Sequence, residues 1–158
     1  AIAQYVPGHL SRLRAIDDRL AILDLEASYA VAWDFGRAQA WAEVFTGDGS
    51  FEMLATANTP HLRVCGHAEL RAFCKQINRE WSGLHYMHPP KLEIEDDAAT
   101  SVIFFEFRHV LRRDDGHVRQ GNTGGHYHTR YVRTPAGWRI QSRVEKAVFE
   151  NVSNTYPV

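Results

Sequence analysis

The sequence predicts an α+β fold, in which helices pack on one side of an antiparallel β-sheet. Apolar residues in the first half of the chain recur at spacings of three and four, which is the period of an amphipathic helix. The second half contains runs that alternate between apolar and polar residues, separated by turn sequences such as Asp-Asp-Gly and Pro-Ala-Gly. Helices followed by a meander of strands are typical of α+β domains.

The helical segments are predicted from the positions of their apolar residues. Residues 1–10 lack a helical period and are expected to form an arm. Gly36 interrupts the helical pattern, a short second helix follows over residues 38–45, and a third helix starts at about residue 65 and ends close to Gly83. The first and longest helix covers about residues 11–35, and its stripe comprises Leu13, Ile16, Leu20, Leu23, Ala27, Ala30 and Val31.

The remaining segments are predicted to be strands and turns. A turn at residues 46–49 leads into a strand at residues 50–54, and residues 55–64 form a polar loop around Pro60. No repeat or linker divides the chain, so residues 1–158 are expected to form a single domain with a C-terminal tail at residues 150–158. The later strand segments are residues 85–96, 99–116, 117–137 and 138–150.

Composition limits the classes of partner. A chain of 158 residues with 44% hydrophobic content can enclose one core and a pocket. Lysine and arginine total 18 against 19 acidic residues, which disfavours nucleic acid and anionic membranes as partners. No apolar run approaches the ~20 residues of a membrane span, and the first thirty residues do not read as a signal peptide. We therefore expect a cytoplasmic protein. Cys65 and Cys74 form no CxxC pattern and are expected to be thiols.

Strand alternation indicates which side chains share a face of the sheet. Tyr127, Thr129 and Tyr131 share one face and form a better pocket lining than the alternate residues beside them. Arg143 belongs to a polar row with Arg139, Gln141 and Glu145, from which it could reach a pocket. A strongly apolar face, expected to be concave, carries Ile103, Phe105, Phe107, His109 and Leu111.

Asp34 is an unusual residue for its position. It falls at the C-terminal end of an apolar helix, between Trp33 and Phe35, where both desolvation and the helix dipole disfavour an anion. Such a carboxylate needs a donor, and a His-Asp pair would orient an imidazole as a base. His85 and His109 are the candidates for this partner. Alternatively, Asp34 faces solvent or caps the turn, and the histidines bond to backbone carbonyls.

Metal and nucleophilic chemistry have less support. His85 and His88 form an HxxH pattern, and His126 and His128 form an HxH pattern. Neither pattern belongs to a recognised motif that would supply the third ligand of a metal site. His88 lies an odd number of residues from His85, so the two do not share a strand face. No GxSxG motif occurs, and the glycine-rich stretch at residues 121–125 precedes a strand rather than a helix. We expect neither a metal nor a cofactor.

The order of these features resembles a known family. The stretches "LDLEASYAVAWDFGRAQAWAEVFTGDGSFEM", "LHYMH" and "GGHYHTRYVRTPAGWRIQSR" are similar to the SnoaL-like polyketide cyclase family within the nuclear transport factor 2-like cone fold. The resemblance covers about residues 13–149 and is strongest to the branch that includes scytalone dehydratase and hexachlorocyclohexane dehydrochlorinase. It implies a curved antiparallel sheet wrapped around the N-terminal helices, a deep pocket and a homodimer or homotrimer.

The resemblance also implies roles for particular residues. It places a catalytic base at His85 and the carboxylate that orients it at Asp34. Trp33 and Met53 stand where scytalone dehydratase has two tyrosines, and Tyr29 stands where the dehydrochlorinase has a lysine. The substrate-binding residues expected from faces and resemblance together are Tyr29, Trp33, Met53, Phe105, Phe107, His109, Thr129, Tyr131 and Arg143.

These expectations combine into a cofactor-independent lyase that acts on an aromatic or cyclic small molecule. His85 would remove a proton and water would leave, with carbon–carbon cleavage, such as loss of formaldehyde, as a variant. Phe149 would add to the apolar cavity. The alternatives are a non-catalytic assembly subunit, like the small subunit of a ring-hydroxylating dioxygenase, and an isomerase or cyclase of the same fold.

Overall fold

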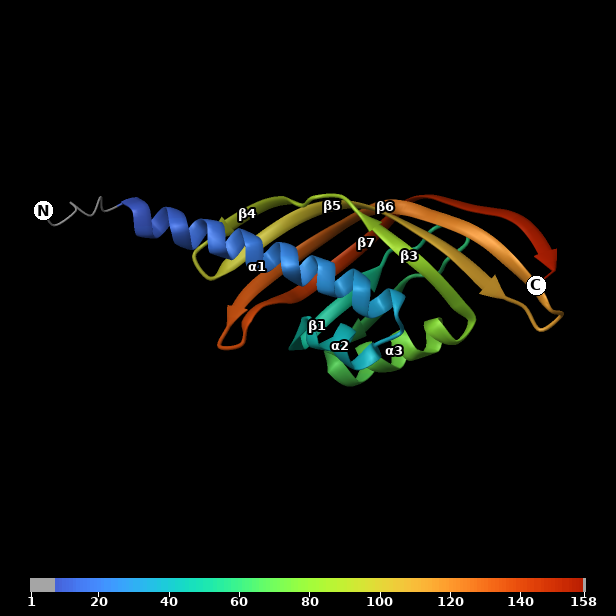
Figure 1. The fold of residues 1–158 in the computed structure, drawn as a ribbon. Helices are drawn as coiled ribbons and strands as arrows, with labels where there is room; N and C mark the ends of the chain where they lie inside the picture. The colour runs from blue at the N-terminus through green and yellow to red at the C-terminus, as the bar shows by residue number, and fades with distance from the viewer. Residues whose placement is uncertain (1–7, 158) are drawn as a thin grey trace, which may run out of the picture.

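The computed structural model describes residues 8–157 and has helices beneath one face of an arched sheet, as Figure 1 shows. This arrangement confirms the predicted α+β fold with a curved sheet. Among residues 8–157, no helix has both the length and the apolar character needed to cross a membrane. The elements in chain order are α1 (Gly8–Asp34), α2 (Ala38–Glu43), β1 (Phe45–Met53), β2 (Leu62–Cys65), α3 (Gly66–Glu80), β3 (Trp81–Met87), β4 (Lys91–Glu95), β5 (Ala98–Arg112), β6 (His117–Thr134) and β7 (Gly137–Pro157).

The sheet has the strand order β2-β1-β7-β6-β5-β3, and β4 pairs with β5 beyond the end of β3. All of these pairs are antiparallel except β1 and β7, which run parallel. The sheet is thus antiparallel, as predicted, apart from this one parallel pair. The parallel pair arises because the chain passes through β2, α3 and the whole meander before β7 returns beside β1.

Only one face of α1 packs under the sheet. Ile22, Leu25 and Tyr29 are buried, whereas much of the predicted apolar stripe faces outward. Leu13 and Leu20 are each 55% exposed, and the first turns of α1 reach beyond the sheet (Figure 1). The helix begins at Gly8, so residues 8–10 continue the helix instead of forming the expected arm, and residues 1–7 lie outside the described residues.

Several predicted boundaries differ in the structure. The expected polar loop ends in β2, and α3 ends at Glu80, so that Trp81 already begins a strand. The segment predicted as one strand over residues 85–96 is two strands, β3 and β4, that pair with different parts of β5. Pro89 and Pro90 explain the break, because proline lacks the N–H that a ladder hydrogen bond requires.

An irregularity in β7 changes the face on which Arg143 lies. The pairing with β6 shifts from Tyr131 opposite Ile140 to Arg130 opposite Ser142, which leaves Gln141 as an extra residue. Arg143 therefore shares the inner face with Ile140 rather than the polar row predicted by simple alternation. The strand also continues to Pro157, so residues 150–157 extend β7 rather than forming a separate tail.

Candidate active site

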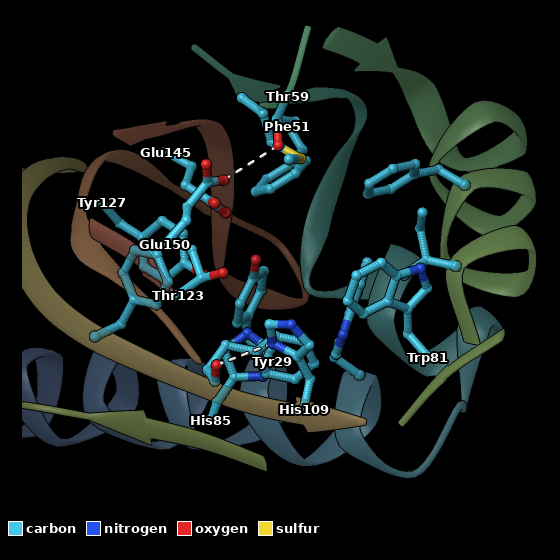
Figure 2. Close-up of a pocket in the computed structure, with 16 residues that line it drawn as sticks. Tyr29, Phe51, Thr59, Trp81, His85, His109, Thr123, Tyr127, Glu145 and Glu150 are labelled. Atoms are coloured by element: carbon cyan, nitrogen blue, oxygen red, sulfur yellow. Dashed lines mark hydrogen bonds between the residues drawn. The ribbon is translucent and has the colours of Figure 1, made fainter. Parts of the chain in front are cut away.

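A cavity of about 250 Å³ lies between the inner face of the sheet and the helices, as Figure 2 shows. Its walls come from α1, α3 and strands β1, β3, β5, β6 and β7. Most of the lining is aromatic or aliphatic, and it includes neither lysine nor arginine. The lining residues are Tyr29, Trp33, Phe51, Met53, Thr59, Phe73, Ile77, Trp81, His85, Phe105, Phe107, His109, Thr123, Tyr127, Glu145 and Glu150.

The C-terminal turn of α1 holds Asp34 against β3. Gly36 ends the helix with a φ of 64°, and its N–H donates to the carbonyl of Trp33 at 2.8 Å. Asp34 is the last helical residue, where the helix dipole disfavours an anion. Two donors from β3 compensate for this position. The backbone N–H of His85 donates to Oδ2 of Asp34 at 2.8 Å, and Nδ1 of His85 lies 2.6 Å from Oδ1.

The pair fixes the tautomer of the neutral His85 imidazole. An ionised carboxylate only accepts hydrogen bonds, so Nδ1 carries the proton and the neutral ring keeps its lone pair on Nε2. The side chains of His85 and Asp34 are only 5% and 10% exposed, which shields their interaction from water. His85 lines the cavity while Asp34 lies behind it. This arrangement can orient a base toward a bound molecule.

A row of aromatic rings continues from His85 along the cavity. The ring of Phe107 lies 4.5 Å from that of His85 and 5.2 Å from that of His109, and Trp81 contacts His109 at 4.7 Å. Burial lowers the pKa of His109, although its hydrogen bond to the carbonyl of Phe107 acts in the opposite direction. Gly121 makes room for this histidine, because a Cβ there would collide with Nε2 of His109. His109 is therefore a tightly enclosed part of the wall.

Two carboxylates, Glu145 and Glu150, lie on a different side of the cavity from His85 and His109 (Figure 2). Glu150 accepts hydrogen bonds from the hydroxyls of Thr56 at 2.8 Å and Thr59 at 3.1 Å, which tie the loop between β1 and β2 to β7. Burial raises the pKa of Glu145 to about 7, against the opposing effects of the Tyr127 hydroxyl and the Arg143 guanidinium. The cavity thus combines two imidazoles with two carboxyl groups.

Arg143 is fully buried behind the cavity wall. Its guanidinium lies between the rings of Tyr29 and Tyr127, 4.0 and 4.7 Å from their centroids, and forms an ion pair with Glu26. It also donates to the hydroxyl of Thr129 at 3.1 Å. The opposing charge of Glu26 holds the pKa of Arg143 above its usual range despite burial. The ion pair is part of a sealed polar cluster.

The expected contacts of Thr129, Tyr131 and Arg143 with a ligand need correction for this reason. The Tyr131 hydroxyl donates to Glu26 at 2.6 Å and lies 2.7 Å from the Ser101 hydroxyl, so it completes the same cluster as Arg143. All three side chains are at most 2% exposed, and none lines the cavity. Tyr29 and Tyr127 stand between the cluster and the cavity.

The other predicted site residues do come together. The cavity lining contains Tyr29, Trp33, Met53, His85, Phe105, Phe107 and His109. Phe149 is outside the lining and 41% exposed. His88 is exposed, and His126 and His128 contact each other away from the cavity. Within the described part of the chain, no three histidine, cysteine or acidic side chains are grouped as metal ligands.

The sequence patterns did not indicate Glu145, Glu150 or Trp81 as site residues. Glu145 had a signal, because it occurs two residues after Arg143 in the same polar row. Glu150 was expected at the start of a tail, and Trp81 was assigned to the end of a helix rather than to a strand. Their positions in the cavity depend on long-range pairing, which local patterns do not report.

The family model for the SnoaL-like domain matches residues 14–144. The chain therefore belongs to the SnoaL-like family, as the resemblance in its sequence had indicated. No curated protein matches the chain in sequence.

Solved structures with related folds are similar over most of their lengths. A candidate aromatic ring hydroxylase from Novosphingobium aromaticivorans is 28% identical, with a TM-score of 0.71 over 87% of this chain and 93% of that one. A type 3 hexachlorocyclohexane dehydrochlorinase from Novosphingobium barchaimii is 14% identical, with a TM-score of 0.73 and coverages of 90% and 94%. The β subunit of a candidate aromatic-ring-hydroxylating dioxygenase from N. aromaticivorans is 19% identical, with a TM-score of 0.65 and coverages of 84% and 90%. The last two likenesses establish the shared fold.

Proposed function

We propose that the protein is a cofactor-independent lyase that removes a proton from an aromatic or cyclic small molecule and expels water. The observation that carries this proposal is the pair of Asp34 and His85, in which a shielded carboxylate holds Nδ1 of an imidazole that lines a cavity. Nε2 of His85 makes no hydrogen bond within the part of the chain that the structure describes. It is available to a substrate as a base.

In the proposed reaction, Nε2 of His85 takes a carbon-bound proton next to an activating group such as a ketone. The electrons of the C–H bond form a double bond as the bond to a β-hydroxyl breaks. Asp34 stabilises the resulting imidazolium across the hydrogen bond at Nδ1. Tyr29 lines the cavity with its ring centroid 6.1 Å from that of His85, and its hydroxyl is proposed to bind a substrate oxygen. Arg143 does not line the cavity; its guanidinium contacts the rings of Tyr29 and Tyr127 and its charge acts on Glu145.

The shape and charge of the cavity support a small, uncharged substrate with a ring. Phe105 stacks on Tyr127 with ring centroids 4.1 Å apart, and Trp33 and Phe107 add further flat surfaces. A volume of about 250 Å³ is below the ~300–1,000 Å³ of typical drug-sized sites, which favours one or two fused rings. Because the lining includes two acidic side chains and neither lysine nor arginine, an anionic substrate is disfavoured.

A non-catalytic assembly subunit has less support. Such a subunit has no need of an imidazole whose one nitrogen is held by a buried carboxylate. The 2.6 Å contact of Asp34 with His85 provides that arrangement in this protein. Expulsion of a carbon fragment, isomerisation and cyclisation would begin from the same base. We retain the cytoplasmic location and the homodimer or homotrimer as predictions; exposed apolar residues such as Phe104 and Val148 are consistent with self-association.

The experiment that tests the proposed base uses 1-tetralone, a bicyclic aromatic ketone with no leaving group. In deuterated water, the wild-type protein should exchange the protons beside the carbonyl faster than buffer does, as followed by proton NMR. His85→Ala should slow this exchange by about 10²- to 10⁴-fold, because a general base contributes about that much. His88→Ala is the matched control, because His88 is an exposed histidine three residues away. Equal exchange by His85→Ala and the wild type would contradict the proposal.

A further inference from the structure

Glu145 is one of two cavity-lining carboxyl groups that take no part in the proposed removal of a proton by His85. It lies on β7, and its backbone is fixed by pairing with Met53 of β1 and Tyr127 of β6. Its carboxyl group faces the cavity on a different side from His85 (Figure 2). An elimination needs a base at the carbon-bound proton and an acid at the leaving oxygen, and separate walls can supply the two.

The surroundings of Glu145 favour a bound proton. The titratable groups near it are Tyr127 from β6, Arg143 and Glu150 from β7, and Tyr29 from α1. Desolvation has the largest effect, and the neighbouring negative charge of Glu150 acts in the same direction. Together they raise the pKa of Glu145 to about 7, so that much of the population carries a proton at neutral pH.

The other polar groups of the cavity are poorer proton donors. Burial raises the pKa values of Tyr29 and Tyr127 well above their usual range. Burial lowers the pKa of His109, and its Nδ1 is engaged with the carbonyl of Phe107. Glu150 accepts hydrogen bonds from the loop that precedes β2, which occupies its oxygens. Arg143 lies outside the lining altogether.

We propose that Glu145 is a catalytic acid, which donates its proton to the hydroxyl that leaves. This inference rests on the proposed lyase function and assigns the group that protonates the leaving oxygen. His85 takes the proton from carbon, the C–H electrons form the new double bond, and the C–O bond breaks with its electron pair on oxygen. The oxygen takes the proton of Glu145 and departs as water. The products on the enzyme are imidazolium and carboxylate, and a proton returns from His85 to Glu145 through solvent.

The dependence on the leaving group tests this role. The probes are 3-hydroxy-1-tetralone, which must lose hydroxide unless it is protonated, and 3-acetoxy-1-tetralone, which loses acetate without a proton. With Glu145→Gln, kcat for the hydroxy probe should fall by about 10²- to 10⁴-fold, while kcat for the acetoxy probe should change less than about tenfold. Formation of the naphthol product is followed by absorbance. Glu52→Gln is the matched control, because Glu52 lies on the neighbouring strand outside the cavity lining.

The outcomes separate this role from the proposed function. Failure of the wild type on both probes and on 1-tetralone exchange would overturn the lyase function. Equal losses on both probes in Glu145→Gln, with 1-tetralone exchange intact, would overturn only the role of Glu145. A direct titration is independent of any probe. In protein with ¹³C-labelled glutamate carboxyls, one resonance should titrate near pH 7 and be missing from Glu145→Gln. A Glu145 resonance that titrates below about pH 5 would contradict the proposal.

Discussion

Glu26 and Asp34 both lie on α1 and both pair with a basic side chain from the sheet, but only the partner of Asp34 lines the cavity. Glu26 meets Arg143 in a cluster whose side chains are almost wholly buried behind Tyr29 and Tyr127. Asp34 meets His85, whose second ring nitrogen is left without a protein partner among the described residues.

The two pairs differ in whether their basic side chain can still exchange a proton. A guanidinium stays protonated at all working pH values, so the pair of Arg143 and Glu26 can orient the rings around it but cannot exchange a proton. An imidazole exchanges protons near neutrality, and a carboxylate at one nitrogen directs that exchange to the other. Burial of a charged pair therefore says little about catalysis by itself. A role in catalysis depends on whether an atom that can exchange a proton faces the cavity.

The largest expected effect concerns the sealed pair. Arg143→Met should destabilise the protein by about 3–5 kcal/mol, because it leaves the charge of the buried Glu26 carboxylate without a cationic partner. Adding Glu26→Gln should recover much of this loss, since the amide still accepts from Tyr131 and carries no charge. Urea unfolding measures both variants, and Arg130→Leu, at an exposed position of β6, is the control. If Arg143→Met alone is as stable as the wild type, the pair of Arg143 and Glu26 does not stabilise the fold.

A smaller effect is expected from Glu145, whose carboxyl group lies close enough to Arg143 for the guanidinium charge to affect its pKa. Its raised pKa of about 7, against about 4.5 when unfolded, means that the folded state holds the proton more tightly. Its stabilising contribution is complete below pH ~4.5 and is lost as the pH rises through ~7. The stability of the wild type relative to Glu145→Gln should thus fall by up to about 3 kcal/mol over this window. Urea unfolding at several pH values measures the difference, and a difference that is constant with pH would contradict the assignment.

Much of the fold could be predicted because its signals are local. The helical period of α1, the alternation of β5 and the glycine after Asp34 each act within a few residues, and the structure confirms the α+β fold that they indicated. The outward stripe through Leu13 and Leu20 could not be predicted, since periodicity shows that a helix has a face but not whether the sheet reaches it. The parallel pairing of β1 with β7 joins strands far apart in the sequence and has no local signal.

The site was predictable where a residue conflicted with its surroundings. An anion at the end of an apolar helix required a donor, and His85 was among the candidates even before a resemblance was considered. Arg143 was displaced from its predicted role by the extra residue Gln141 and by the two tyrosine rings that enclose it. Burial is the main cause of the raised pKa of Glu145, and burial depends on the packing of the folded sheet, which local sequence patterns do not report.

Asp34→Asn tests most directly whether the pair of Asp34 and His85 is the base. Both oxygens of Asp34 accept from His85, so an amide must turn its NH₂ toward one of these two donors. If it faces the ring, the proton moves to Nε2 and the base is lost. The measurement is the rate of 1-tetralone deuterium exchange, with Asp24→Asn on the exposed side of α1 as the control. We expect a loss of about 10²-fold or more in Asp34→Asn alone, with unfolding behaviour like that of the wild type. Undiminished exchange in the folded variant would contradict the account.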